Sequence, residues 1–145
     1  MPAFPEAEWF LALGRLMAAE GEEFRRLGYA ETQFTLRVID NDSDRVEATV
    51  GLEFDGYTLI RAESVNDLDA WDPDFILNGR RATWHRMLEE IARNGRPEMR
   101  HTLSSLALMG EELWLESHDQ LREDKFFRFN QTLQEFFNLA AKLPR

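Results

Sequence analysis

The sequence has no cysteine, only three histidines among its 145 residues, and no long uninterrupted apolar run. The absence of cysteine excludes disulfide frameworks, thiolate zinc sites, iron–sulfur clusters and cysteine nucleophiles. No window approaches the roughly 18 consecutive apolar residues that a membrane-spanning helix needs. Since there is neither a reactive thiol nor a secretory signature, we expect a cytoplasmic protein.

Basic residues are also few, with 17 Lys and Arg against 27 Asp and Glu, which gives a formal net charge of −10. Phosphate contacts supply most non-specific affinity for nucleic acids, so this charge predicts no nucleic-acid partner. Glu6 and Glu8 stand where a targeting segment needs positive charge, and we therefore expect no signal or transit peptide. Length and composition predict one globular domain over residues 1–145 that needs neither a disulfide nor a structural metal ion for stability.

The local motifs of common enzyme and cofactor sites are missing as well. There is no Walker loop, no G-x-S-x-G and no G-x-G-x-x-G, and His85, His101 and His118 do not have the spacing of metal ligands. We therefore predict no metal, no cofactor and no catalytic residue. The alternative is an acid–base enzyme in which His101 or His118 works beside a carboxylate such as Asp55 or Asp74.

The apolar residues repeat with two different periods along the chain. A helical period predicts helices over residues 5–27, 80–94 and 119–143. Alternation with a period of two predicts a three-stranded antiparallel meander over 31–64, in which Asp55-Gly56 is the two-residue hairpin turn.

Two further strands complete the predicted sheet. Residues 74–78 predict a short strand that ends at Gly79, and Leu113, Trp114 and Leu115 predict a last one. The rest of 98–117 stays ambiguous between helix and strand. Strands in hairpins with helices segregated around them predict an α+β fold, with a mainly antiparallel five-stranded sheet covered by helices.

Two of the predicted helices carry apolar faces suited to pack over that sheet. The side chains on these faces are Trp84, Met87, Leu88 and Ile91 on one helix, and Phe126, Phe129, Leu133, Phe136 and Phe137 on the other. They wall either a filled core or an apolar pocket, and periodicity does not decide which. Phe127 lies off the apolar face, so we expect it to be exposed, to line a second cavity or mouth, or to be buried in a homodimer contact.

The second half of the chain contains a series of segments with a familiar order. They are Asp74-Phe-Ile-Leu-Asn-Gly79, Trp84 with Met87-Leu-Glu-Glu-Ile91, His101-Thr-Leu, Leu106-Ala-Leu-Met-Gly110, and the aromatic run Phe126 to Phe137. In these segments the chain resembles bacterial proteins of the sterol carrier protein type 2 superfamily. The preceding meander fits the same arrangement. In place of the family's usual Gly-Lys-Leu run, this chain has His101-Thr-Leu-Ser-Ser-Leu106.

The resemblance implies a non-enzymatic lipid-binding or lipid-transfer module. Its ligand would be a fatty acyl, phospholipid or sterol-like molecule held in an apolar tunnel between sheet and helices, and the nine side chains on the apolar faces would line that tunnel. The alternatives are a protein-interaction or regulatory domain with a filled core, and the acid–base enzyme on a hydrophobic substrate.

Residues 80–100 form a basic island on this acidic chain, with six arginines against three glutamates. One interpretation is a solvated face whose arginines pair with nearby acids. The other is contact with an anionic headgroup or transient docking on an anionic membrane, for which Arg80 and Arg81 are the first candidates because they open a helix.

Overall fold

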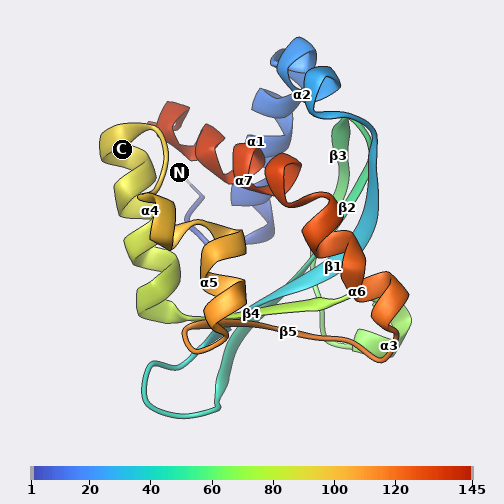
Figure 1. Cartoon of the computed structure of the whole chain (residues 1–145), viewed down its shortest axis with the longest axis vertical. Helices are drawn as coiled ribbons and strands as arrows, with labels where there is room; N and C mark the ends of the chain where they lie inside the picture. Colours follow the sequence, from blue (N-terminus) through green and yellow to red (C-terminus); the bar gives the residue numbers. More distant parts are fainter. Residues whose placement is uncertain (1, 145) are drawn as a thin grey trace.

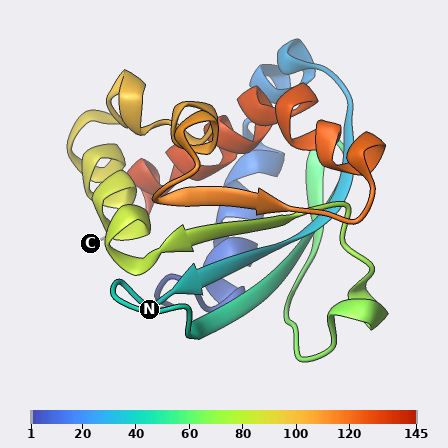
Figure 2. The same ribbon diagram turned by 60° about the horizontal axis from the view of Figure 1, so that its bottom comes forward.

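The protein is built on a five-stranded sheet with helices on one face, as the computed structural model of residues 2–144 shows (Figures 1 and 2). The strands are β1 (Ala30–Ile39), β2 (Val46–Gly56), β3 (Thr58–Ser64), β4 (Ile76–Arg80) and β5 (Leu113–Glu116). Their order in the sheet is β3-β2-β1-β4-β5. The predicted α+β class and strand number are confirmed.

The sheet is mainly antiparallel, as predicted. The pairs β1–β2, β2–β3 and β4–β5 are antiparallel, and β1 and β4 are parallel. The parallel pair follows from the crossover after β3, which passes through the short helix α3 (Leu68–Trp71) and brings β4 to the free edge of β1.

The hairpin between β2 and β3 turns one residue later than predicted. Asp55 pairs with Thr58, so Gly56 and Tyr57, and not Asp55 and Gly56, are the central residues of the turn. Gly56 has φ 80°, and no positive φ is found at Tyr57. A turn of the II′ kind needs a positive φ at its first central position alone, which glycine supplies without steric cost.

The helices are α1 (Ala7–Ala19), α2 (Gly21–Leu27), α4 (Arg81–Asn94), α5 (Leu103–Met109), α6 (Gln120–Arg128) and α7 (Asn130–Asn138), with 3₁₀ turns η1 (Met99–His101) and η2 (Leu139–Lys142). The single helix predicted over 5–27 is wrong, because the chain bends at Glu20, whose backbone has φ −98° and ψ 36°. Gly21, a poor helix former, follows the bend, which turns the buried Phe24 toward the core.

The single helix predicted over 119–143 is also wrong. It breaks at Phe129, which has φ −108° and ψ 14° and separates α6 from α7. Just after the break, the Asn130 side-chain amide donates to the Phe127 carbonyl at 2.6 Å. The break lets Phe126 pack on Phe75 while Phe136 of α7 packs on Phe54, in different parts of the sheet.

Tertiary packing also changes the predicted end of the fourth strand. Gly79 lies within β4, paired with Val38 and Leu113, and does not end the strand. A Cβ at Gly79 would lie 2.5 Å from Trp84 Nε1, so glycine is required for the indole of α4 to lie on the strand. The helix predicted over 80–94 is confirmed as α4, and the ambiguous stretch contains η1, α5 and β5.

The two faces of the sheet differ in what covers them. Helices α5, α6 and α7 lie above the sheet in Figure 2, and the large hydrophobic core is on that side. On the opposite face, α3 places the Trp71 ring on Gly51, where a Cβ would meet the ring at 2.5 Å. Within residues 2–144, no helix has both the length and the apolarity to cross a membrane.

Candidate functional site

Seven of the nine side chains predicted to wall a core or pocket are fully or almost fully buried in the hydrophobic core between the sheet and the helices. Leu88 is half-buried and packs against the edge of this core. Phe129 is half-buried at the break between α6 and α7, and it is not one of the side chains that form or border the core. Leu88 lines a shallow surface pocket of about 420 Å³ near the chain ends. The structure therefore brings the two predicted apolar faces into one interior, in agreement with their periodicity.

Aromatic rings run through this interior from one end to the other. Neighbouring ring centroids are 4.7 to 6.3 Å apart in the series Phe126, Phe75, Phe34, Phe54, Phe136, Phe137 and Trp84. Such distances are those of favourable stacked and edge-to-face pairs. The rings are packed against each other along this path, so the described interior is filled in this conformation.

Asp74 fastens α6 to the sheet. It is only 5% exposed and stands just before β4. Its carboxylate accepts hydrogen bonds from the Thr32 hydroxyl at 2.8 Å, the Gln33 amide at 3.1 Å, Arg122 Nε at 3.0 Å and Lys125 Nζ at 3.3 Å. Two donors belong to β1 and two to α6, so one carboxylate joins these elements.

The charge state of Asp74 follows from these contacts. Burial acts to raise the pKa of its carboxyl, but the hydrogen bonds from Thr32, Arg122 and the Gln33 amide, together with the Lys125 charge, hold that pKa below its ordinary value. The group is therefore ionised at neutral pH, when its ion pairs with Arg122 and Lys125 hold α6 in place.

A pocket of about 520 Å³ opens beside α6, between α3 and the end of β5. Its apolar wall includes Phe75, Ile76 and Leu115. Its charged rim consists of Asp69, Asp72, Glu116, Asp119, Glu123, His118 and Arg122. Arg122 is occupied by Asp72 and Asp74, so the rim is acidic on balance.

Phe75 belongs both to the pocket and to the series of interior rings. It is fully buried, and its ring centroid is 4.7 Å from that of Phe34 and 5.7 Å from that of Phe126. Phe75 therefore stands at the boundary between the pocket and the interior.

Phe127 is 42% exposed in the single chain, and its place at a homodimer contact or a pocket mouth stays a prediction. Its ring packs edge-on against Phe126 at 5.1 Å.

Arg80 and Arg81 contact the turn between β1 and β2. Arg80 Nη1 donates to the carbonyl oxygens of Asp40 at 2.9 Å and Ser43 at 2.5 Å, and Arg81 Nη1 donates to Glu47 Oε2 at 2.5 Å. These contacts hold α4 against the turn. A headgroup at either arginine would have to compete with them.

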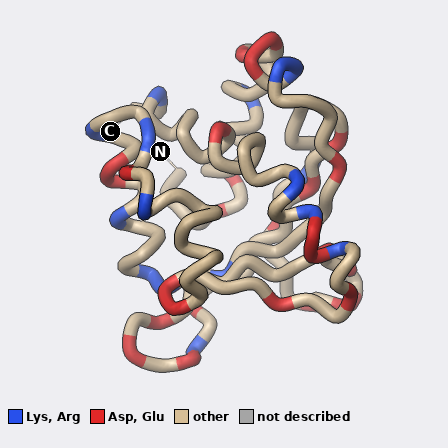
Figure 3. Tube along the Cα trace, in the orientation of Figure 1, with Lys and Arg blue, Asp and Glu red and all other residues tan. Residues whose placement is uncertain are grey.

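Most of the other arginines of the basic island are also paired. Within residues 2–144, ion pairs join Arg86 to Glu112, Arg93 to Glu89 and Arg100 to Glu98. Acidic positions lie among the more numerous basic ones in this part of the chain (Figure 3). Membrane contact stays a prediction, to be checked by cosedimentation of wild type and an Arg80→Glu/Arg81→Glu variant with anionic and neutral vesicles.

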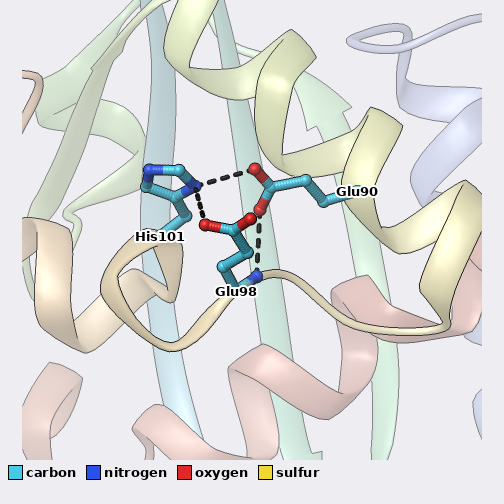
Figure 4. Close-up of side chains that lie close together, drawn as sticks. All are labelled: Glu90, Glu98 and His101. Carbon is cyan, nitrogen blue, oxygen red and sulfur yellow. Dashed lines mark hydrogen bonds and ion pairs between the residues drawn. The ribbon is translucent and has the colours of Figure 1, made fainter.

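The histidines do not form the acid–base pairs considered from the sequence. His101 Nδ1 lies 2.7 Å from Glu90 Oε2, and the Glu98 amide donates to Glu90 Oε1 at 3.0 Å (Figure 4). His118 lines the pocket beside α6, whereas Asp55 and Asp74 line a separate pocket on the other side of Arg122. The carboxylate beside His101 is therefore that of Glu90, and neither Asp55 nor Asp74.

Glu90, Glu98 and His101 present oxygen and nitrogen atoms within 4.8 Å of one another, a spacing that a metal ion could use. Burial acts to raise the pKa of Glu90, but the hydrogen bonds from the Glu98 amide and His101 hold it below its ordinary value. Both oxygens of the buried carboxylate are used in fastening the turn after α4, so we assign the cluster a structural role.

Sequence reasoning did not find the ion pairs that hold α6. Arg122 and Lys125 are three residues apart and share a helix face, which is a readable signal. Their common partner Asp74 lies 48 and 51 residues away. Only the folded chain shows that these three charges meet.

Comparison with known proteins gives no sequence-level match and two structural ones. No protein-family model and no curated protein matches the chain. A crystal structure of sterol carrier protein 2 matches with a TM-score of 0.66 and 23% identity, covering 98% of this chain and 100% of that one. A solution structure of the conserved hypothetical protein TT1886 of Thermus thermophilus, described as a candidate sterol carrier protein, matches with a TM-score of 0.61 and 22% identity over 98% and 90% of the two chains.

The fold is therefore that of sterol carrier protein 2, as the resemblance in the sequence predicted. The likeness extends over almost the whole length of both chains.

Proposed function

We propose that the protein binds a fatty acyl or sterol-like molecule between its sheet and the α6–α7 pair, and carries it without chemical change. The fold likeness to sterol carrier protein 2 supports this role. The apolar side chains that face one another across the interior supply the surface that such a ligand needs.

The position of Phe75 is the observation that carries the proposal. The pocket beside α6 has a volume of about 520 Å³, within the range of small-molecule sites, and one of its walls is this interior ring. An apolar chain that enters the pocket reaches the aromatic interior once the Phe75 and Phe126 rings move apart. The pocket is thus the mouth, and the ring-filled interior is the binding site.

Movement of α6 provides the opening. Phe126 is the buried side chain of this helix, and α6 is joined to α7 at the break at Phe129. If α6 swings at this break, Phe126 leaves the interior and vacates space next to Phe75. The ion pairs of Asp74 with Arg122 and Lys125 keep α6 closed when no ligand is present.

The charge of the mouth sets the headgroup preference. Five carboxylates stand on the rim, and the Arg122 charge is already paired. A ligand carboxylate or phosphate would be repelled there, whereas a hydroxyl group could donate a hydrogen bond to a rim carboxylate. The site is therefore selective for a neutral headgroup over an anionic one.

Native mass spectrometry of the purified protein, followed by titration with hexadecanol, palmitate and cholesterol, tests the proposal. We expect a bound lipid mass, tighter binding of hexadecanol than of palmitate, and intermolecular NOEs from the ligand chain to Phe136 and Phe137. Absence of a stoichiometric complex with all three ligands would contradict lipid binding. Tighter binding of palmitate would contradict the assigned headgroup selectivity.

A pair of variants on α6 tests the route of entry. Phe126→Ala removes the ring that closes the interior, so hexadecanol should associate faster than with wild type in stopped-flow fluorescence. Phe127→Ala makes the same chemical change at a half-exposed neighbour and should leave the rate unchanged. Equal rates in wild type and Phe126→Ala would show that the ligand does not enter beneath α6.

A second candidate function is a protein-interaction module with a filled core. It is favoured by the packed rings and by apolar side chains exposed on η1, α5 and α6, namely Met99, Leu108, Met109 and Leu121. Failure of all three lipids to bind, with retention of the packed core, would support it in place of lipid carriage.

A further inference from the structure

The sheet face opposite the helices carries a second pocket, of about 580 Å³, which lipid binding in the interior does not use. Its lining includes Arg37 and Ile39 of β1, Asn78 and Arg80 of β4, and Trp114 and Glu116 of β5. Arg37 pairs with Asn78 and Asn78 with Trp114 in the strand register, so these three positions form one row across the sheet.

Two polar side chains in this row lack hydrogen-bond partners. Asn78 is 1% exposed; its Nδ2 donates to Glu116 Oε1 at 3.2 Å, but its Oδ1 accepts no hydrogen bond within residues 2–144. Arg37 Nε is also buried and unpartnered in this part of the chain. Buried polar groups are almost always hydrogen-bonded in folded proteins, so these two adjacent groups have an acceptor and a donor to offer a molecule that enters the pocket.

The charge of Arg37 is weakly compensated. Within residues 2–144 its ion pair is with Glu116, and the 4.0 Å between Arg37 Nη1 and Glu116 Oε2 is too long for a hydrogen bond. The Glu116 side chain is 51% exposed, whereas that of Arg37 is only 19% exposed. Glu116 is thus the cover that can swing outward to uncover both Arg37 and Asn78.

Arg80 has a different role in the same pocket. Its guanidinium is engaged with the β1–β2 turn and lies 4.9 Å from the centre of the Trp114 ring. These contacts hold the indole in place as a wall of the pocket. The pocket therefore combines a cation, a hydrogen-bond acceptor and an aromatic surface, and Asp44 and Glu111 also stand at its edge.

We propose that this pocket binds a small planar carboxylate that also carries a hydroxyl or amine donor. The ligand carboxylate replaces Glu116 in front of the Arg37 guanidinium, and its donor group reaches Asn78 Oδ1. Its ring lies against Trp114. This site lies on the face of the sheet opposite the interior, although Glu116 stands at the edge of both this pocket and the pocket beside α6.

4-Hydroxybenzoate is the probe, titrated into ¹⁵N-labelled protein and followed by amide chemical shifts. We expect a Kd of about 1 mM, as suits a ligand of this size, with the largest shifts at Arg37, Asn78 and Trp114. Benzoate lacks the hydroxyl donor and 4-hydroxybenzamide lacks the charge, so each should bind about tenfold more weakly or worse.

Variants assign the contacts. Arg37→Gln should weaken 4-hydroxybenzoate binding about tenfold or more, while Arg26→Gln, a matched change at an exposed arginine of α2, should not. Glu116→Gln removes the competing carboxylate and should tighten binding, which keeps the test decisive if Arg37→Gln does not fold. The proposal is overturned by absence of saturable binding, or by an affinity that Glu116→Gln does not raise.

Discussion

Replacing Phe136 by alanine tests how firmly the aromatic interior is packed. The Phe136 ring is fully buried, edge-on to Phe54 at 5.0 Å and to Phe137 at 5.7 Å. Removing it leaves a cavity between rings that are themselves held by further neighbours, so the site cannot collapse fully. Phe136→Ala should therefore lower the free energy of unfolding by about 3–5 kcal/mol. In a chain of this length the midpoint of thermal unfolding should fall by roughly 10–15 °C.

The assay is guanidinium denaturation followed by far-UV circular dichroism, because its midpoint and slope separate a loss of stability from a change in compactness. Phe127→Ala is the matched control, since this 42%-exposed ring should cost no more than about 1 kcal/mol. A loss below about 1 kcal/mol for Phe136→Ala, with an unchanged slope, would refute the reasoning. The rings would then line a hollow and would not fill a core.

Three further predictions concern charge and backbone. Asp74→Ala should lower the free energy of unfolding by about 3 kcal/mol in chemical denaturation, because it leaves Arg122 and Lys125 of α6 without their buried partner. The control Asp124→Ala changes an exposed residue of the same helix and should lower it by less than about 0.5 kcal/mol. Asp74 and Glu90 have lowered pKa values in the folded protein, so their contribution to the free energy of unfolding is complete above the ordinary carboxyl range and is lost as pH falls below about 4. A midpoint of unfolding that does not change from pH 7 to pH 3 would contradict this. Gly79→Ala should destabilise the fold by about 1–3 kcal/mol, because the added Cβ would meet the Trp84 indole. Gly21→Ala has open space around it and should be neutral or stabilising by up to about 1 kcal/mol. Equal midpoints of thermal unfolding for the two variants would show that the indole moves aside at no cost.

Local patterning determined which residues pair as strands and which faces turn inward. Alternation over 31–64 was enough to predict the meander, because a strand with one buried face leaves no freedom to shift its register by one residue. Helical spacing likewise predicted α4 with its Gly95 end, and it brought Trp84, Met87 and Ile91 together in the core. These signals are readable because the residues that produce them are close together in the chain.

Helix breaks and turn positions were decided by packing. The apolar spacing does not indicate a helix break at Phe129, since Phe126 and Leu133 fit one continuous helical face. The break arises because Phe126 packs on Phe75 while α7 packs farther along the sheet. The position of the β2–β3 turn similarly depends on the pairing of Asp55 with Thr58.

The sequence by itself determined that this chain would form an antiparallel-rich sheet with an aromatic interior, because burial of apolar faces depends on local periodicity. Only the tertiary structure decided that the rings fill that interior and that Asp74 holds α6 closed over it. The tertiary structure also placed Arg37 beside Asn78, on the face of the sheet opposite the aromatic interior. The physical reason is that packing density and ion pairing depend on distances between residues far apart in the chain, and those distances exist only once the sheet has formed.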